Sequence, residues 1–193
     1  MGMWLLVPIG YLIGSVSTAI VVCRGLGLPD PREQGSNNPG ATNVLRFGGK
    51  KAAAMTLIGD LLKGFIPVIF ASFVGANEIL IGCVGVAAFI GHLFPVYFGF
   101  QGGKGVATAA GVFFGFFWFL GFITVATWLV MLKFTRVSSI SAIIAAATAP
   151  IYAWLLLSSG ALLSATTVIS ILCIWRHRLN IQRLISGVEE RVG

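Results

Sequence analysis

Charged side chains are scarce in this sequence. Only 10% of the 193 residues are Asp, Glu, Lys or Arg, whereas 57% are hydrophobic, and soluble domains carry about 25% charged residues. A chain this short cannot hide so much apolar surface in a core of its own. The composition therefore excludes an ordinary soluble domain. It predicts an all-α integral membrane protein whose apolar surface has the lipid bilayer as its partner.

Residues that bind metals or act as nucleophiles are also few. The sequence has two histidines and three cysteines, and the cysteine spacing matches no zinc motif. A Gly-x-Ser-x-Gly elbow is absent, and so is the His-x-x-x-x-Asp motif of acyl-CoA-dependent glycerolipid acyltransferases. These absences predict a protein that uses no metal and no other cofactor.

The positive charge of the chain does not gather in one patch. A net charge of +7 is by itself compatible with nucleic-acid binding. Apart from Lys63, however, the basic residues punctuate the apolar runs, as they do in loops that membrane proteins keep on the cytoplasmic side. We therefore expect no nucleic-acid partner. The basic groups are Arg24–Lys51, Lys104, the pair Lys133 and Arg136, and the tail Arg176–Arg191.

Apolar runs divide the chain into membrane spans, each of which needs about 20 apolar residues. No basic region precedes the first run and no small-residue cleavage site follows it, so we expect a retained span and not a signal peptide. One membrane-embedded domain over residues 1–193 is predicted. The simple runs are Trp4–Cys23, Ala52–Val74, Ile79–Phe100, Ile140–Leu157 and Ala161–Trp175.

The segment Val106–Leu132 is too long for one comfortable span and too short for two full ones. Its centre, Gly115–Gly121, contains no basic residue. If the basic groups share one side of the membrane, this segment must cross and return as two short helices. The prediction is then seven transmembrane helices, two of them short, with the N-terminus outside and the C-terminus cytoplasmic. A single long tilted helix is the alternative.

The first polar motif is Gly35–Asn43, followed by Arg46. Its Gly and Asn residues accept positive φ, so successive backbone N–H groups can point the same way and form an anion nest. A helix from Ala41 onwards would place its N-terminus beside this nest, and Arg46 is suited to bidentate phosphate binding. The motif predicts a phosphate site. The alternative is a flexible linker.

The second motif, Gly102–Thr108, places three glycines around Lys104 directly before a predicted helix. Open backbone N–H groups, a cation and a helix dipole together favour phosphate. The spacing is not that of a Walker A motif, and no strand precedes it, so a nucleotide is not expected. A plain turn that carries one positive-inside lysine is the alternative.

The third motif has two parts, the hydroxyl-bearing loop Lys133–Ser139 and the helix end His177–Leu184. On a helix, His177 and Asn180 lie on one side, so both are expected to enter a cavity with Arg183 near its rim. A purely structural histidine is the alternative. Asp60 and Lys63, inside a span, are either functional or an ion pair that braces the helix.

These motifs resemble those of a known family. The three cytoplasmic motifs of the bacterial acylphosphate-dependent glycerol-3-phosphate acyltransferases are similar to Gly35–Asn43 with Arg46, Gly102–Thr108, and Ser138–Ser139 with His177–Arg183. The resemblance covers nearly the whole chain. One departure is Asn37, where the family more often has glycine.

The resemblance implies transfer of an acyl group from acylphosphate to the 1-hydroxyl of glycerol 3-phosphate, which gives lysophosphatidic acid and phosphate in the first step of phospholipid synthesis. It also implies seven helices in the bacterial plasma (inner) membrane, with the active site on the cytoplasmic face. Acylphosphate carries a good leaving group, so the phosphate of glycerol 3-phosphate can serve as the base; His177 is the competing base. A small transporter or channel subunit for an organic phosphate is the rival interpretation.

The resemblance also implies roles for individual residues. The candidate catalytic residues are Ser36, Lys104, His177 and Asn180. The candidate substrate- and phosphate-binding residues are Asn37, Asn38, Thr42, Asn43, Arg46, Gly102, Gly103, Gly105, Ser138, Ser139 and Arg183. No metal ligand and no cofactor are implied, and the oligomeric state stays unknown.

Overall fold

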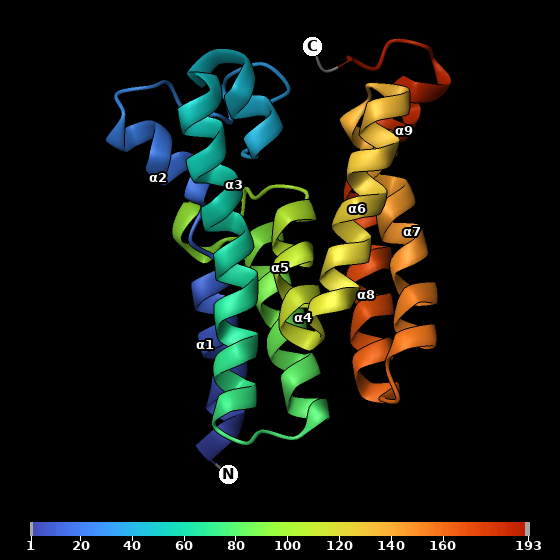
Figure 1. The fold of residues 1–193 in the computed structure, drawn as a ribbon. Coiled ribbons are helices and arrows are strands. Elements are labelled where there is room, and N and C mark those ends of the chain that lie inside the picture. The colour runs from blue at the N-terminus through green and yellow to red at the C-terminus, as the bar shows by residue number, and fades with distance from the viewer. Residues whose placement is uncertain (1, 192–193) are drawn as a thin grey trace.

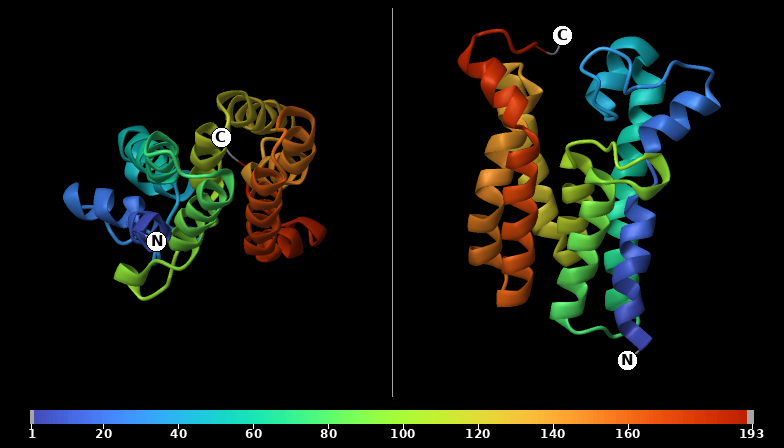
Figure 2. Two further views of the ribbon diagram at one scale, coloured as in Figure 1. Left: turned by 90° about the horizontal axis from the view of Figure 1, so that it is seen from below. Right: turned by 180° about the vertical axis from the view of Figure 1, so that it is seen from behind.

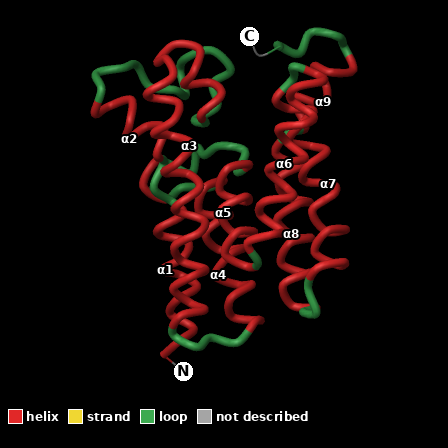
Figure 3. Tube along the Cα trace, viewed as in Figure 1, coloured by secondary structure: helices red, strands yellow, loops and turns green. Residues whose placement is uncertain are grey.

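The computed structural model describes residues 2–191, and no strand occurs within that range (Figures 1 and 3). The chain is a bundle of helices, as the composition predicted. The elements are η1 Gly2–Leu5, α1 Leu6–Gly14, α2 Thr18–Gly25, α3 Ala41–Phe73, α4 Glu78–Leu93, η2 Val96–Phe98, α5 Val106–Phe116, α6 Trp118–Thr135, α7 Ser138–Leu156, α8 Gly160–Arg176 and α9 Arg178–Ile185.

The bundle has two groups of helices. Helices α1, α3, α4 and α5 lie side by side in one group, and α6, α7 and α8 form the other (Figures 1 and 2). Contacts of α5 with α6 and of α4 with α8 join the two groups. A buried cluster that includes Phe89, Val112, Phe113 and Ile169 fills the space between them.

The two ends of the bundle differ in polarity. The N-terminus and the connections at 74–77 and 157–159 lie at one end, whereas the 26–40 segment, α9 and the C-terminal segment lie at the other (Figure 1). Neither of the two connections at the first end contains a basic residue. The basic segments Arg24–Lys51 and Arg176–Arg191 belong to the second end, as the charge pattern predicted.

Several helices are long and apolar enough to cross a membrane. Four qualify singly, and the number rises to six if the bent pairs α1–α2 and α8–α9 each count as one span. The apolar helix α5 is shorter. Helix α3 extends the predicted span Ala52–Val74 backwards to Ala41, with a kink at Gly49, whose φ of 77° is left-handed.

The first apolar run is broken, which the sequence interpretation did not foresee. The segment Gly2–Gly14 and helix α2 meet at an angle of 43°, and α2 leads away from the bundle (Figure 1). The Val16 carbonyl at the break finds a partner, because Lys63 donates to it at 2.8 Å. The Ser15 hydroxyl donates to the Tyr11 carbonyl, also at 2.8 Å. The break is thus compatible with a membrane setting, where backbone polar groups need partners within the protein.

The segment Val106–Leu132 folds back on itself, as predicted, and the alternative of one long helix is wrong. Helices α5 and α6 meet at Phe117, whose backbone is extended (φ −160°, ψ 123°), and run in opposite directions (Figure 1). Gly121 permits the close approach, because a Cβ there would lie 2.4 Å from the Phe114 ring. Helix α6, with 18 residues, is longer than the half-depth helix expected.

Candidate active site

A cavity of about 740 Å³ opens among α3, α5, α6, α7, α9 and the C-terminal segment. Residues from all three motifs reach its wall, which confirms that distant polar segments converge. Three candidates, Asn37, Gly102 and Gly103, do not line it. The candidates that do are Ser36, Asn38, Thr42, Asn43, Arg46, Lys104, Gly105, Ser138, Ser139, His177, Asn180 and Arg183.

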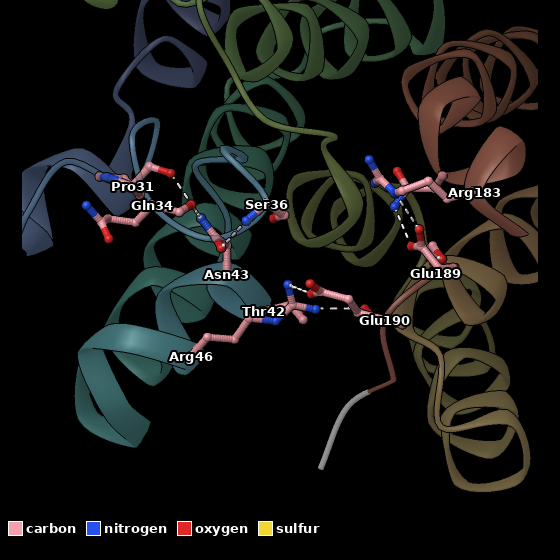
Figure 4. A network of polar contacts seen from close by, with 12 residues as sticks. Pro31, Gln34, Ser36, Thr42, Asn43, Arg46, Arg183, Glu189 and Glu190 are labelled. Carbon is pink, nitrogen blue, oxygen red and sulfur yellow. Dashed lines mark hydrogen bonds and ion pairs between the residues drawn. The ribbon is translucent and has the colours of Figure 1, made fainter. Parts of the chain in front are cut away.

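The first motif is held in place by Asn43, which is buried at the start of α3. Its side-chain amide donates to the carbonyls of Pro31 (3.0 Å) and Gln34 (2.9 Å), and its oxygen accepts the N–H of Ser36 at 2.9 Å (Figure 4). All three bonds are internal to the protein. This geometry favours a role in shaping the loop around Ser36 over direct contact with a substrate.

The backbone conformation of Asn37 explains the one departure from the family pattern. Its φ is 56°, in the left-handed region that favours glycine, and asparagine is one of the few other residues that adopt it readily. The residue is exposed and lies outside the cavity wall. The structure thus gives Asn37 a place in the loop's turn.

Two helix starts bring the halves of the bundle together at the cavity. The hydroxyl of Thr42, on α3, lies 3.4 Å from that of Ser138, on α7. One turn further along α3, Arg46 forms an ion pair with Glu190 of the C-terminal segment (Figure 4). The segment after α9 therefore reaches across from the α6–α9 half to α3.

The glycines of the second motif allow the loop to approach α4 closely. A Cβ at Gly103 would lie 2.4 Å from His92 Nε2, and one at Gly102 would lie 2.1 Å from the His92 carbonyl oxygen. At Gly105, where φ is 86°, a Cβ would lie 2.3 Å from the Phe89 ring. The N–H of Gly103 also donates to the His92 carbonyl at 3.2 Å. The expected open nest is therefore smaller than the sequence suggested.

Lys104 brings a half-buried ammonium group to the cavity. Burial, with a smaller effect from the positive charges of Arg183, Arg176 and Arg46, lowers the pKa of this ammonium to about 8, although the carboxylate of Glu189 acts in the opposite direction. An anion placed in the cavity would favour the protonated form. Lys104 is therefore well suited to bind phosphate near neutral pH.

His177 and Asn180 face the cavity from the junction of α8 and α9, as the helical spacing predicted. His177 Nδ1 lies 2.8 Å from the carbonyl oxygen of Cys173. A carbonyl only accepts hydrogen bonds, so Nδ1 carries the proton and Nε2 keeps its lone pair. The side-chain oxygen of Asn180 is buried without a partner among residues 2–191. Both residues therefore retain acceptor capacity.

Glu189 was missed by the sequence interpretation. Its carboxylate accepts hydrogen bonds from Ser139 (2.7 Å), Asn180 (2.6 Å) and Arg183 (2.7 Å). Burial tends to raise the pKa of Glu189, but these three hydrogen bonds bring it below the usual range. An internal carboxylate thus already engages two candidate binding residues, Ser139 and Arg183, and one candidate catalytic residue, Asn180.

A buried polar cluster lies beneath the second motif. Lys63 Nζ lies 2.8 Å from Asp60 Oδ1, and His92 Nδ1 lies 3.6 Å from the same oxygen. The bracing ion pair considered from sequence is therefore present, with the break after α1 tied to it through Lys63. Asp60 and His92 also reach the cavity wall, and the sequence interpretation had given His92 no role.

The rest of the cavity wall is apolar. It includes Leu57 and Leu61 from α3 and Val125, Trp128 and Leu129 from α6. One cavity therefore combines a cationic, hydrogen-bonding region with a hydrocarbon surface, an arrangement that suits a ligand with a phosphate head and an acyl chain. Among residues 2–191, no group of three His, Cys, Asp or Glu side chains could hold a metal ion. The metal-free expectation stays a prediction.

Comparison with known sequences points to one family. A family model described as glycerol-3-phosphate acyltransferase matches residues 4–187. A glycerol-3-phosphate acyltransferase of Methylococcus capsulatus (strain Bath) is 54% identical over 190 residues, which cover 98% of this chain and 96% of the relative. Another, of Thioalkalivibrio sulfidiphilus, is 55% identical over 183 residues, which cover 95% of this chain and 90% of the relative.

Comparison with solved structures agrees. The chain is similar to the crystal structure of PlsY (YgiH), an integral membrane glycerol 3-phosphate acyltransferase, in its glycerol 3-phosphate form. The TM-score is 0.95 at 38% identity, over 100% of this chain and 96% of that one. The lysophosphatidic acid form of PlsY gives a TM-score of 0.94 at 36% identity, with the same coverage.

Proposed function

The chain belongs to the glycerol-3-phosphate acyltransferase family, and we propose that it takes the acyl group from acylphosphate and transfers it to the 1-hydroxyl of glycerol 3-phosphate. The products are lysophosphatidic acid and inorganic phosphate, and the reaction is the first step of phospholipid synthesis. The family resemblance inferred from the three motifs is confirmed. The single observation that supports this donor and this acceptor together is the joining of a cationic region and an apolar wall in one cavity.

The polar region suits two phosphate-bearing substrates. Both are anions, so binding them side by side requires cations and directed hydrogen-bond donors. Lys104 and Arg46 supply the cations, while Ser36, Thr42 and Ser138 add hydroxyl groups along the same wall. Arg183 contributes less directly, because its Nε already bonds Glu189.

The apolar wall suits the hydrocarbon chain of the donor. Each buried CH₂ group contributes about 0.8 kcal/mol to binding, so a long acyl chain favours binding strongly without any polar contact. Leu57 and Leu61 on α3 face the cavity together with Val125 and Leu129 on α6. We infer that the acyl chain lies between these two helices, with its phosphate toward Lys104.

The reaction needs little help with its leaving group. The hydroxyl oxygen of glycerol 3-phosphate attacks the acyl carbon, the bond from that carbon to the phosphate oxygen breaks, and the hydroxyl proton passes to a phosphate oxygen. Positioning alone can lower such a barrier by about 7–11 kcal/mol. We propose that a substrate phosphate is the base. His177, with Nε2 unprotonated, and Asn180 orient the reacting groups by hydrogen bonds.

We also propose a topology. Helices α1, α3, α4, α5, α6, α7 and α8 make seven spans, with the N-terminus outside and the C-terminus cytoplasmic. The basic segments at the cavity end support this orientation through the positive-inside rule. The cavity then opens on the cytoplasmic face of the bacterial plasma membrane, where the soluble substrate glycerol 3-phosphate is at hand.

The test is the release of phosphate by purified protein in detergent. Acylphosphate supplied with glycerol 3-phosphate should release phosphate and form lysophosphatidic acid in equal amounts, whereas either substrate alone should release none. Phosphate release without glycerol 3-phosphate would mean a hydrolase. Movement of glycerol 3-phosphate across a vesicle membrane without acyl transfer would support the transporter instead, an alternative that the family assignment does not favour.

A further inference from the structure

Arg176, the last residue of α8, forms hydrogen bonds to the glycine loop before α5, Gly102–Gly105. Its Nη2 donates to the carbonyl of Gly102 at 2.8 Å, and its Nε donates to the carbonyl of Gly103 at 3.1 Å. One planar guanidinium thus spans two successive peptide groups, a geometry that only a rigid fork of donors provides. Sequence reasoning had placed Arg176 only among the basic residues of the tail.

These two hydrogen bonds fix the direction of the next backbone donor, the N–H of Lys104. In a trans peptide the N–H points opposite to the C=O, and no cis peptide occurs among residues 2–191. The carbonyl of Gly103 points at Arg176, so the N–H of Lys104 points away from it. The N–H of Gly103, in turn, is occupied by the His92 carbonyl. Gly102 does not line the cavity, so the first loop amide that is left for a ligand there is that of Lys104.

The same contacts remove an electrostatic obstacle. Carbonyl oxygens carry partial negative charge and would repel a phosphate if they faced the cavity. Arg176 binds two of them instead and compensates their partial charge. The guanidinium is itself held in place, because it is half-buried and lies 5.7 Å from the centre of the Phe94 ring.

We propose that Arg176 is a positioning residue for phosphate binding, which acts by holding the Gly102–Gly105 loop with the Lys104 amide and ammonium directed at the substrate. Arg176 need not touch the substrate itself, since its Nε and Nη2 groups both bond loop carbonyls. The proposal rests on the proposed function only in that the bound phosphate belongs to a substrate of the reaction.

The experiment compares Arg176→Gln and Arg176→Lys with Arg178→Gln as the matched control. Arg178 is exposed, its guanidinium lies 4.6 Å from the centre of the Trp175 ring, and it donates to the Trp175 carbonyl and to no loop carbonyl among residues 2–191. For Arg176→Gln we expect the KM of at least one phosphate substrate to rise about tenfold, with a much smaller change in kcat. A tenfold rise corresponds to the loss of one charged hydrogen bond at the weak end of its usual range. Arg176→Lys keeps the positive charge but not the forked pair of donors, so its KM should lie between those of the wild type and Arg176→Gln. The KM of Arg178→Gln should match that of the wild type.

Inorganic phosphate serves as a second probe, because it is a product and should compete for the same loop. Its inhibition constant should rise in Arg176→Gln in parallel with the KM. The proposal is overturned if kcat falls while KM and phosphate inhibition stay at wild-type values, or if all three are unchanged in a folded variant. If Arg176→Gln does not fold, Arg176→Lys alone decides in the same way. If the wild-type protein fails to use acylphosphate, the proposed function is refuted. The role of Arg176 is then still tested by comparing the binding of inorganic phosphate to the wild type and to Arg176→Gln.

Discussion

Arg46 on α3 and Glu190 in the C-terminal segment form an ion pair across the cavity (Figure 4). The pair joins the two halves of the bundle in the substrate-free protein and occupies a guanidinium that we propose binds phosphate. A substrate phosphate must therefore compete with the Glu190 carboxylate for Arg46.

Glu190→Gln should lower the KM of a phosphate substrate, because the competing charge is gone. The carboxylate is largely exposed, and exposed ion pairs are weak, so the change should not exceed about fivefold. Steady-state kinetics at low and high salt measure it, and the difference should shrink as salt screens the charges. A higher KM would mean that Glu190 helps to form the site.

The charge of Lys104 predicts a basic limb in the pH profile. Its pKa is lowered to about 8, so the ammonium is present below that pH and lost above it. We expect kcat/KM, which reports the free enzyme, to fall above about pH 8. In Lys104→Arg the guanidinium stays charged, so the limb should vanish even if the absolute rate is lower. The same limb in both proteins would assign it to another group.

The bond from His177 Nδ1 to the Cys173 carbonyl leaves Nε2 as an acceptor, so two substitutions at His177 are needed to distinguish this residue from a substrate phosphate as the base. If a substrate phosphate takes the proton, His177→Asn, whose amide still offers a hydrogen-bond donor and an acceptor, should retain measurable turnover, and His177→Ala should lose more. Single-turnover kinetics with bound substrate measure both. Burial lowers the pKa of His177 to about 4. Should the two variants be equally inactive while substrate still binds, and should the wild-type rate fall along one acidic limb near that pH, His177 is the general base.

The topology is testable with single cysteines in a protein that lacks its three native ones. Cysteines at Glu78, Trp118 and Ser158, which are all exposed, should react with an impermeant reagent from outside the cell. Cysteines at Glu33 and Lys133, also exposed, should react only after the membrane is opened. Labelling of Trp118→Cys from the inside alone would contradict the seven-span arrangement.

Much of the fold was readable from charge and hydropathy. The fold-back within Val106–Leu132 followed from the absence of basic residues near Trp118, because the positive-inside rule acts on sequence directly. The break after Gly14 was not readable. At the break, the Val16 carbonyl is satisfied at 2.8 Å by Lys63, a residue distant in sequence.

The candidate site was readable as a set of segments but not as a set of roles. Residue types predicted that the three motifs would meet around phosphate, and twelve candidates do line one cavity. Asn43 and Gly103, however, turn out to bond or pack within the protein. Glu189 was overlooked because a carboxylate in a basic tail carries no local signal. Its three partners come together only in the folded chain.

The most direct test of the proposed reaction is the identity of the acyl donor. Purified protein is given labelled glycerol 3-phosphate with acylphosphate, or with the same acyl group as acyl-CoA, and the lipid product is identified by mass spectrometry. Our account predicts 1-acyl lysophosphatidic acid from acylphosphate alone, with one inorganic phosphate released per product. Lysophosphatidic acid formed from acyl-CoA and not from acylphosphate would contradict it.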